Sequence, residues 1–76
     1  MKYTVYTQPG CDACESLCER LRSKGHEVEV LTFEILSKME DIDRRNDLMA
    51  KIHNRNTSDV PILFANDEII AIRLAV

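Results

Sequence analysis

The chain has 76 residues, of which 45% are hydrophobic and 30% charged, with only two glycines and two prolines. This composition is typical of one compact soluble domain and argues against a linker or a disordered tail. A domain of this size buries only about 60% of its unfolded surface, so a large internal substrate cavity is not expected. The net charge of −3 argues against phosphate-backbone binding as the main task, since nucleic-acid binders usually carry a concentrated positive face.

Nothing in the sequence has the character of a targeting or membrane segment. The first residues, Met1 to Val5, enter an alternating pattern without the apolar core of a signal peptide. No apolar run approaches the ~20 residues needed to cross a bilayer. We therefore expect a cytoplasmic protein that binds neither a membrane nor nucleic acid. In a reducing compartment three cysteines, an odd number, argue against a structural disulfide framework.

The first predicted elements are a strand and a helix. Residues 3–7 alternate ring or branched side chains with polar ones, which predicts a half-buried strand, and Pro9-Gly10 ends it. A helix is predicted next, ending at Lys24-Gly25. Its apolar stripe has the spacing i, i+3, i+4 and i+7 and consists of Cys14, Leu17, Cys18 and Leu21.

A second strand and a second helix are predicted in the middle of the chain. Residues 28–35 carry branched and aromatic side chains on both parities, which predicts a buried central strand. Ser37 and Glu40 have the spacing of a capping box and predict the start of a helix that ends near His53-Asn54. The looser apolar stripe of this helix consists of Met39, Ile42, Met49 and Ile52.

The last third of the chain predicts a hairpin. A polar loop is expected over residues 55–59. Residues 62–65 and 68–72 are then two strands, because Asn66-Asp67 between them tolerates positive φ. The predicted order is βαβαββ, in an α/β fold with a single domain over residues 1–76.

The first chemical motif is a CxxC pair, Cys11 and Cys14, between the first strand and the first helix. A thiol at a helix amino terminus meets unpaired N–H groups and the positive end of the helix dipole, which stabilise thiolate, so Cys11 is the expected nucleophile. Cys14, one turn later, is placed to attack a mixed disulfide on Cys11 and release reduced substrate. The pair therefore predicts thiol–disulfide exchange.

Asp12 opposes the helix dipole, because its negative charge disfavours a thiolate next to it and raises the pKa of Cys11. The helix dipole and the Asp12 charge therefore shift the pKa of Cys11 in opposite directions. If the thiolate is the less stabilised, the disulfide form is relatively favoured and the protein is a better reductant, which suits an electron donor.

Half of a zinc site is the alternative interpretation of the CxxC pair, but such a site needs two more ligands at a matching spacing. Only Cys18, His26 and His53 are available, and the sequence has no second CxxC and no HxxxH. Cys18 is interpreted as a small core residue, with a regulatory or rival resolving thiol as the alternative. Both histidines are expected at the surface. We therefore predict redox chemistry without a metal.

The chain resembles the glutaredoxin family, especially its short thioredoxin-fold members that reduce ribonucleotide reductase. The resemblance covers nearly the whole chain. It is carried by Tyr6-Thr7 before the CxxC pair, by Ser23-Lys24-Gly25 at the helix end, and by Asp59-Val60-Pro61 before a strand.

The resemblance implies a thioredoxin-like fold with a four-stranded mixed sheet and a dithiol reductase without a metal or organic cofactor. It implies that Val60–Pro61 is a cis bond and that the backbone there binds the cysteinyl part of glutathione or of a substrate strand. X-Pro is also the only kind of bond that becomes cis with any ease. Gln8 and Asp12 complete the implied binding residues beside the catalytic Cys11 and Cys14.

Three features differ from the family pattern. Gln8 is neutral where family members often carry a basic residue that supports thiolate and the glutathione carboxylate. Residues 71–73 replace the Gly-Gly and following aspartate that hold the γ-glutamyl end in glutathione-dependent relatives, which favours thioredoxin reductase over glutathione as the electron source. The sequence stops where relatives add a final helix, so we expect an apolar end without full cover: Ile69, Ile70, Ile72, Leu74 and Val76.

Two hypotheses follow. The first is a reductase supplied by glutathione or by thioredoxin reductase, with a disulfide-containing protein such as ribonucleotide reductase as substrate. The second is a redox-inactive module of the same fold that docks a partner through its exposed C-terminal strand. The second helix adds either a basic patch for an acidic partner or a solvated face balanced by nearby acids. The basic residues concerned are Arg44, Arg45, Lys51 and Arg55.

Overall fold

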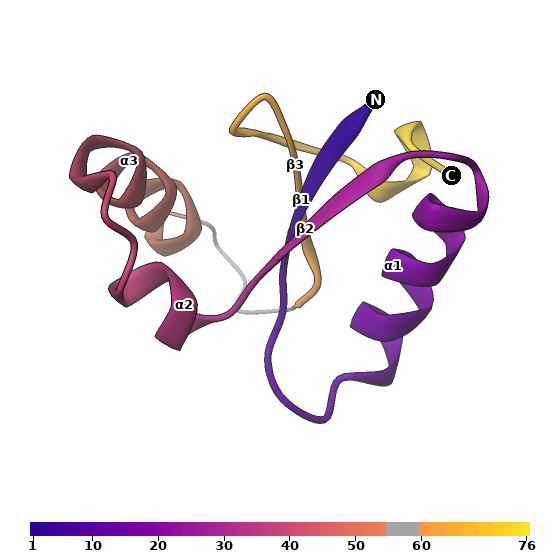
Figure 1. Cartoon of the computed structure of the whole chain (residues 1–76), viewed down its shortest axis with the longest axis horizontal. Helices are drawn as coiled ribbons and strands as arrows, with labels where there is room; N and C mark the ends of the chain where they lie inside the picture. The colour runs from indigo at the N-terminus through magenta and orange to yellow at the C-terminus, as the bar shows by residue number, and fades with distance from the viewer. Residues whose placement is uncertain (55–59) are drawn as a thin grey trace.

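The computed structural model describes residues 1–54 and 60–76, so the predicted polar loop at 55–59 lies outside the described residues. A four-stranded sheet with the order β2-β1-β3-β4 forms its centre (Figure 1). The strands are β1 (Lys2–Tyr6), β2 (Glu27–Leu31), β3 (Ile62–Ala65) and β4 (Glu68–Ile70). β1 and β2 are parallel and the other two pairings are antiparallel. The sheet is therefore mixed, and the thioredoxin-like α/β fold is confirmed.

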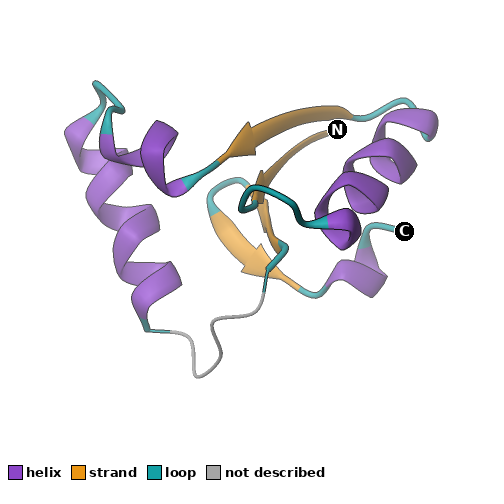
Figure 2. Cartoon of the chain, turned by 90° about the horizontal axis from the view of Figure 1, so that it is seen from below, coloured by secondary structure: helices purple, strands orange, loops and turns teal. Residues whose placement is uncertain are grey.

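Helices cover both faces of the sheet (Figure 2). α1 (Asp12–Ser23) lies on one face, whereas α2 (Phe33–Ser37) and α3 (Ile42–His53) lie on the other. One turn of 3₁₀ helix, η1 (Ile72–Leu74), follows β4 on the side of α1. The core accordingly has two parts, one under α1 and one under α2 and α3. No helix within the described residues is long and apolar enough to span a bilayer.

The first helix forms as its sequence predicts. All four residues of the predicted stripe are buried, and Leu21 is fully enclosed. The helix ends at Ser23 with Lys24 as its C-cap, after which Gly25 adopts a φ of +85° and donates its N–H to the Arg22 carbonyl at 2.9 Å. Glycine adopts this left-handed conformation without the penalty that a Cβ imposes, which is why the helix stops here.

The interpretation of residues 28–35 as a buried central strand is right about a strand over residues 28–31, which lie in β2, and wrong about residues 32–35 and about the central position. β2 ends at Leu31, because its partner β1 ends at Tyr6 in the same register. The next residue, Thr32, accepts a hydrogen bond from the Ile35 N–H at 3.2 Å and starts α2. β2 is also an edge strand. Side-chain periodicity reports which faces of a strand are apolar, but it does not report the place of the strand in the sheet.

The capping box that was predicted at Ser37 and Glu40 is also absent. The Ser37 hydroxyl donates to the Glu34 carbonyl at 2.8 Å, inside the end of α2. α3 begins five residues later than Ser37, with the Asp41 carboxylate accepting from the Arg44 N–H at 3.0 Å. The predicted end at His53 is confirmed. α2 is thus an additional helix, which the expected βαβαββ order did not contain.

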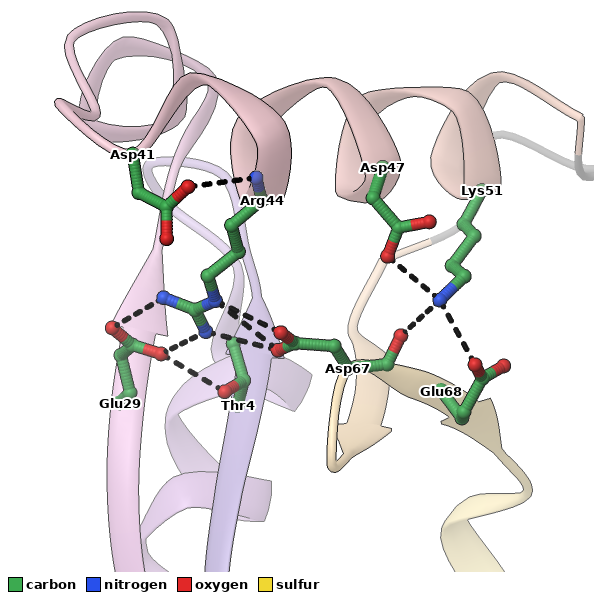
Figure 3. A network of polar contacts seen from close by, with 8 residues as sticks. All are labelled: Thr4, Glu29, Asp41, Arg44, Asp47, Lys51, Asp67 and Glu68. Carbon is green, nitrogen blue, oxygen red and sulfur yellow. Dashed lines mark hydrogen bonds and ion pairs between the residues drawn. The ribbon is translucent and has the colours of Figure 1, made fainter.

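Ionic contacts fasten α3 to the sheet (Figure 3). The Arg44 guanidinium binds the carboxylates of Glu29 on β2 and Asp67 in the β3–β4 turn, with closest distances of 2.6 and 3.1 Å. Thr4 on β1 donates its hydroxyl to Glu29 at 3.0 Å. Hydrogen bonding to Arg44 lowers the pKa of Glu29, although partial burial opposes this. The same bonds to Glu29 and Asp67 raise the pKa of Arg44.

Lys51 makes the second set of contacts between α3 and the hairpin (Figure 3). Its ammonium group binds the carboxylates of Asp47 at 2.8 Å and Glu68 at 3.1 Å, and it donates to the Asp67 carbonyl at 2.6 Å. Arg44 and Lys51 are therefore neutralised by acids of this chain. This arrangement favours the balanced face over the basic patch for these two residues, while Arg55 lies outside the described residues.

The hairpin turn is confirmed, whereas the C-terminal end differs from the expectation. Asn66 and Asp67 have φ values of +52° and +62°. β4 ends at Ile70, and the chain then turns back through η1 and buries Ala75 against the α1 side of the core. The expected lack of cover is wrong for Ile69, Ile70 and Val76, which pack against the core, and right for Ile72 and Leu74, which are exposed.

Candidate redox site

The turn between β1 and α1 places the CxxC pair at one end of the sheet. Thr7 is buried and donates its N–H to the Leu31 carbonyl at 2.7 Å, which fixes the end of β1 against β2. Gly10 then adopts a φ of +77°, which reverses the chain into the start of α1. The residue after this turn is Cys11.

Cys11 is the N-cap of α1. Its extended backbone leaves the side chain free to accept a hydrogen bond from the Cys14 N–H at 3.1 Å. The Cα atoms of Cys11 and Cys14 are 5.2 Å apart and the two sulfurs form a disulfide. Cys11 is half-buried, whereas Cys14 is only 2% exposed. Cys11 is therefore accessible to an external disulfide, whereas Cys14 is shielded from it.

A pocket of about 260 Å³ opens beside the pair, between the β1–α1 turn, the inner face of α1 and the end of β2. Gln8, Cys11 and Cys14 all contribute to its wall. Glu15 is the one charged side chain among the described residues that line it, and it is exposed. The pocket surroundings are thus neutral to acidic, with Asp12 exposed at the first position of α1.

Val60 and Pro61 lie at the same end of the sheet on the other side of β1. Their peptide bond is cis, as the resemblance implies. Pro61 directly precedes β3, whose first residue Ile62 pairs with Tyr6 at the end of β1. Because β2 and β3 flank β1 on opposite sides, the cis bond and the pocket approach the dithiol from opposite sides. The structure thus gathers Gln8, Cys11 and Cys14 around one pocket and leaves Val60 and Pro61 outside its wall.

The glutaredoxin family model matches residues 3–70. The chain belongs to the glutaredoxin family. No curated protein and no solved structure matches it. Glutaredoxins are thiol–disulfide oxidoreductases that need no bound cofactor and use glutathione as a cosubstrate, and the Cys11–Cys14 pair of this chain is at disulfide distance.

Sequence reasoning missed the side of this glutaredoxin site that β2 provides. Val30 and Thr32 line the pocket with the cysteines, but they are brought there by the parallel register of β1 and β2 and carry no local motif. The place of Glu15 near the redox pair could have been predicted from the sequence. It follows the N-cap Cys11 by four residues, and residues four apart on a helix lie on the same face. Thr7 was predicted as the last residue of the first strand and as part of the family resemblance, but not as part of a pocket wall.

The third cysteine of this glutaredoxin is a core residue, as interpreted from its place on the stripe. Cys18 is 5% exposed, and burial raises the pKa of its thiol although the charge of Arg22 opposes this. A high thiol pKa keeps Cys18 protonated and poorly nucleophilic.

The two histidines differ. His26 is half-buried and its ring packs edge-on against Tyr3, with centroids 5.1 Å apart, so its expected surface position is only partly right. His53 is exposed at the end of α3. Within residues 1–54 and 60–76, no three His, Cys, Asp or Glu side chains are grouped so that they could hold a metal ion.

Proposed function

We propose that this glutaredoxin is a dithiol reductant of protein disulfides that acts in the cytoplasm. The observation that carries the proposal is the pairing of an accessible Cys11 at the start of α1 with a shielded Cys14 one turn later. One free, buried thiol beside a redox pair also fits a reducing compartment, where structural disulfides are rare.

The reaction proceeds in two exchanges. The Cys11 thiolate attacks one sulfur of the substrate disulfide; the substrate S–S bond breaks, and the departing sulfur takes up a proton. The Cys14 thiolate then attacks the Cys11 sulfur, which releases the second substrate thiol and leaves the Cys11–Cys14 disulfide. Two electrons have passed to the substrate, and a reductant must supply two electrons to the protein.

The charges around the pair support a flavoprotein such as thioredoxin reductase as that reductant. Glutathione carries two carboxylates, and the described residues nearest to Cys11 offer Gln8, Asp12 and Glu15 but no cation in the pocket wall. The Gly-Gly pair of glutathione-dependent relatives is absent as well. A protein disulfide, such as that of ribonucleotide reductase, is the substrate that the family resemblance supports.

The test is NADPH consumption with a small soluble disulfide, run with glutathione plus glutathione reductase in one arm and with thioredoxin reductase in the other. We expect turnover with thioredoxin reductase that disappears in Cys11→Ser, whose hydroxyl preserves the cap of α1. Turnover in the glutathione arm alone would reassign the electron source. If NADPH is consumed in neither arm and Cys11→Ser still binds its partner, the result would instead favour the redox-inactive docking module.

A further inference from the structure

No described residue pairs with the outer hydrogen-bonding edge of β2. β2 is the outermost strand of the sheet, and no described element lies beyond its outer side (Figure 2). Toward β1, the Glu27 N–H donates to the Met1 carbonyl at 3.0 Å and the Leu31 carbonyl accepts from Thr7 at 2.7 Å. Backbone groups of successive strand residues point to alternate sides, so Val28 and Val30 direct their N–H and C=O groups outward.

This edge has charge as its protection but no backbone block. Native edge strands are commonly protected by charged side chains, proline or a bulge; β2 is a regular five-residue ladder that carries Glu27 and Glu29 but neither proline nor a bulge. Its Val30 side chain remains 37% exposed on the face of α1. A second copy of the chain is a poor occupant, because antiparallel pairing of two β2 edges would bring the like charges of Glu27 and Glu29 together.

The edge leads to the redox pair. Val30 and Thr32, at the end of β2, line the same pocket of about 260 Å³ as Cys11 and Cys14. A chain that extends the sheet beyond β2 therefore passes next to Val30, with its side chains on the α1 face directed toward this pocket. A substrate chain at this edge lies on the opposite side of β1 from Val60–Pro61. Its contact with β2 is therefore separate from the backbone contact at Val60–Pro61 that the family resemblance implies.

We propose that an extended segment of the protein substrate pairs with the outer edge of β2 as an additional strand and places its disulfide in the pocket against Cys11. The inference rests on the proposed function, since it names how that substrate binds. The segment that fits is apolar or neutral in the pocket, with one lysine or arginine opposite Glu15, the charged group of the pocket wall.

The test traps the first intermediate. In Cys14→Ser, Cys11 forms a stable mixed disulfide with a ten-residue peptide that has one activated cysteine and one lysine. The matched control carries a 2-mercaptoethanol moiety on Cys11. Backbone amide hydrogen exchange is then measured by NMR for both adducts. We expect the Val28 and Val30 amides to exchange at least about tenfold more slowly in the peptide adduct, because only these amides gain partners.

The outcomes separate the two proposals. Unchanged exchange at Val28 and Val30 in a fully formed adduct, or protection confined to Val60, would overturn the edge pairing and leave the reductase function intact. Protection that appears in the control adduct and grows with protein concentration would show pairing between copies, and would also overturn it. Failure of Cys11 to form any mixed disulfide would overturn the proposed function and the pairing with it.

Charge supplies a second, independent readout. In the Cys14→Ser background, the lysine peptide is compared with one carrying glutamate at the same position. We expect the lysine peptide to form the adduct about threefold faster at low salt, a difference of the size that exposed charge pairs produce. The difference should vanish in Glu15→Gln. Equal rates for the two peptides before that substitution would contradict the assigned role of Glu15.

Discussion

The Cys14 backbone N–H donates to the Cys11 sulfur at 3.1 Å, so the proposed nucleophile of this glutaredoxin is also the N-cap of its first helix. A charged acceptor forms the stronger hydrogen bond. The structure shows this bond in the disulfide form, and we expect the same cap to stabilise thiolate over thiol at Cys11 in the reduced protein.

Substitutions at Cys11 separate the cap from the chemistry. Serine is a preferred N-cap residue and alanine is not, so reduced Cys11→Ala should be about 1 kcal/mol less stable than reduced Cys11→Ser. Both should lose all disulfide reduction. Urea denaturation under reducing conditions measures the difference in stability. Equal stability of the two variants would show that the N-cap at position 11 does not stabilise α1.

Cys18 should be inert in the folded protein. Its burial and raised pKa keep the thiol neutral and out of reach. We expect iodoacetamide at pH 7.5 to modify Cys11 of the reduced protein at least about a hundredfold faster than Cys18, because thiolate is the reacting form. Mass spectrometry of a time course gives both rates. Early modification of Cys18 would revive its interpretation as a regulatory or resolving thiol.

The Glu29–Arg44 pair predicts loss of stability in acid. The pKa of Glu29 is lowered from its ordinary value of 4.5 by the Arg44 hydrogen bonds. A lowered folded-state pKa contributes stability that is present above 4.5 and is lost as the pH falls through the folded value. Comparing denaturation at pH 7 and pH 3, we expect the wild type to lose more stability than Glu29→Gln does.

Arg44 should contribute to the stability of the folded protein at neutral pH. Arg44→Met leaves the carboxylates of Glu29 and Asp67 facing each other without a cation, and both are partly shielded. The cost should lie between those of exposed and buried pairs, about 1–2 kcal/mol. Arg44→Lys keeps the charge but loses the planar guanidinium group that reaches both carboxylates. Its stability should therefore lie between those of the wild type and Arg44→Met.

Local patterns were sufficient for the parts of this fold whose interactions are local. The stripe from Cys14 to Leu21, the stop at Gly25 and the turn at Asn66-Asp67 each depend on residues within one turn of helix or one hairpin. The position of Cys11 at the start of α1 followed from the same patterns. These features and the candidate nucleophile could therefore be predicted from the sequence.

Features that depend on long-range register could not be predicted. Residues 33–35 have strand-like composition, yet pairing with β1 ends at Leu31 and the Thr32 cap turns the chain into α2. Glu29 and Arg44 meet across 15 positions because α3 crosses the sheet. The wall that Val30 adds to the redox pocket has the same origin, so the β2 side of the pocket became visible only in the structure.

Gln8 offers the sharpest test of which reductant serves this protein. It lines the pocket beside Cys11, at the position where the family resemblance implies a basic residue, and Asp12 and Glu15 leave that end of α1 acidic. A cation there would lower the pKa of Cys11 by favouring its thiolate and would attract the carboxylates of glutathione. We therefore expect Gln8→Arg to increase glutathione-linked turnover about fivefold, and Gln8→Glu, its matched control, to reduce it.

The pH dependence of Cys11 alkylation should move to lower pH in Gln8→Arg. If alkylation shifts while glutathione-linked turnover does not, charge at this position controls the thiolate alone, and the missing Gly-Gly pair is what excludes glutathione.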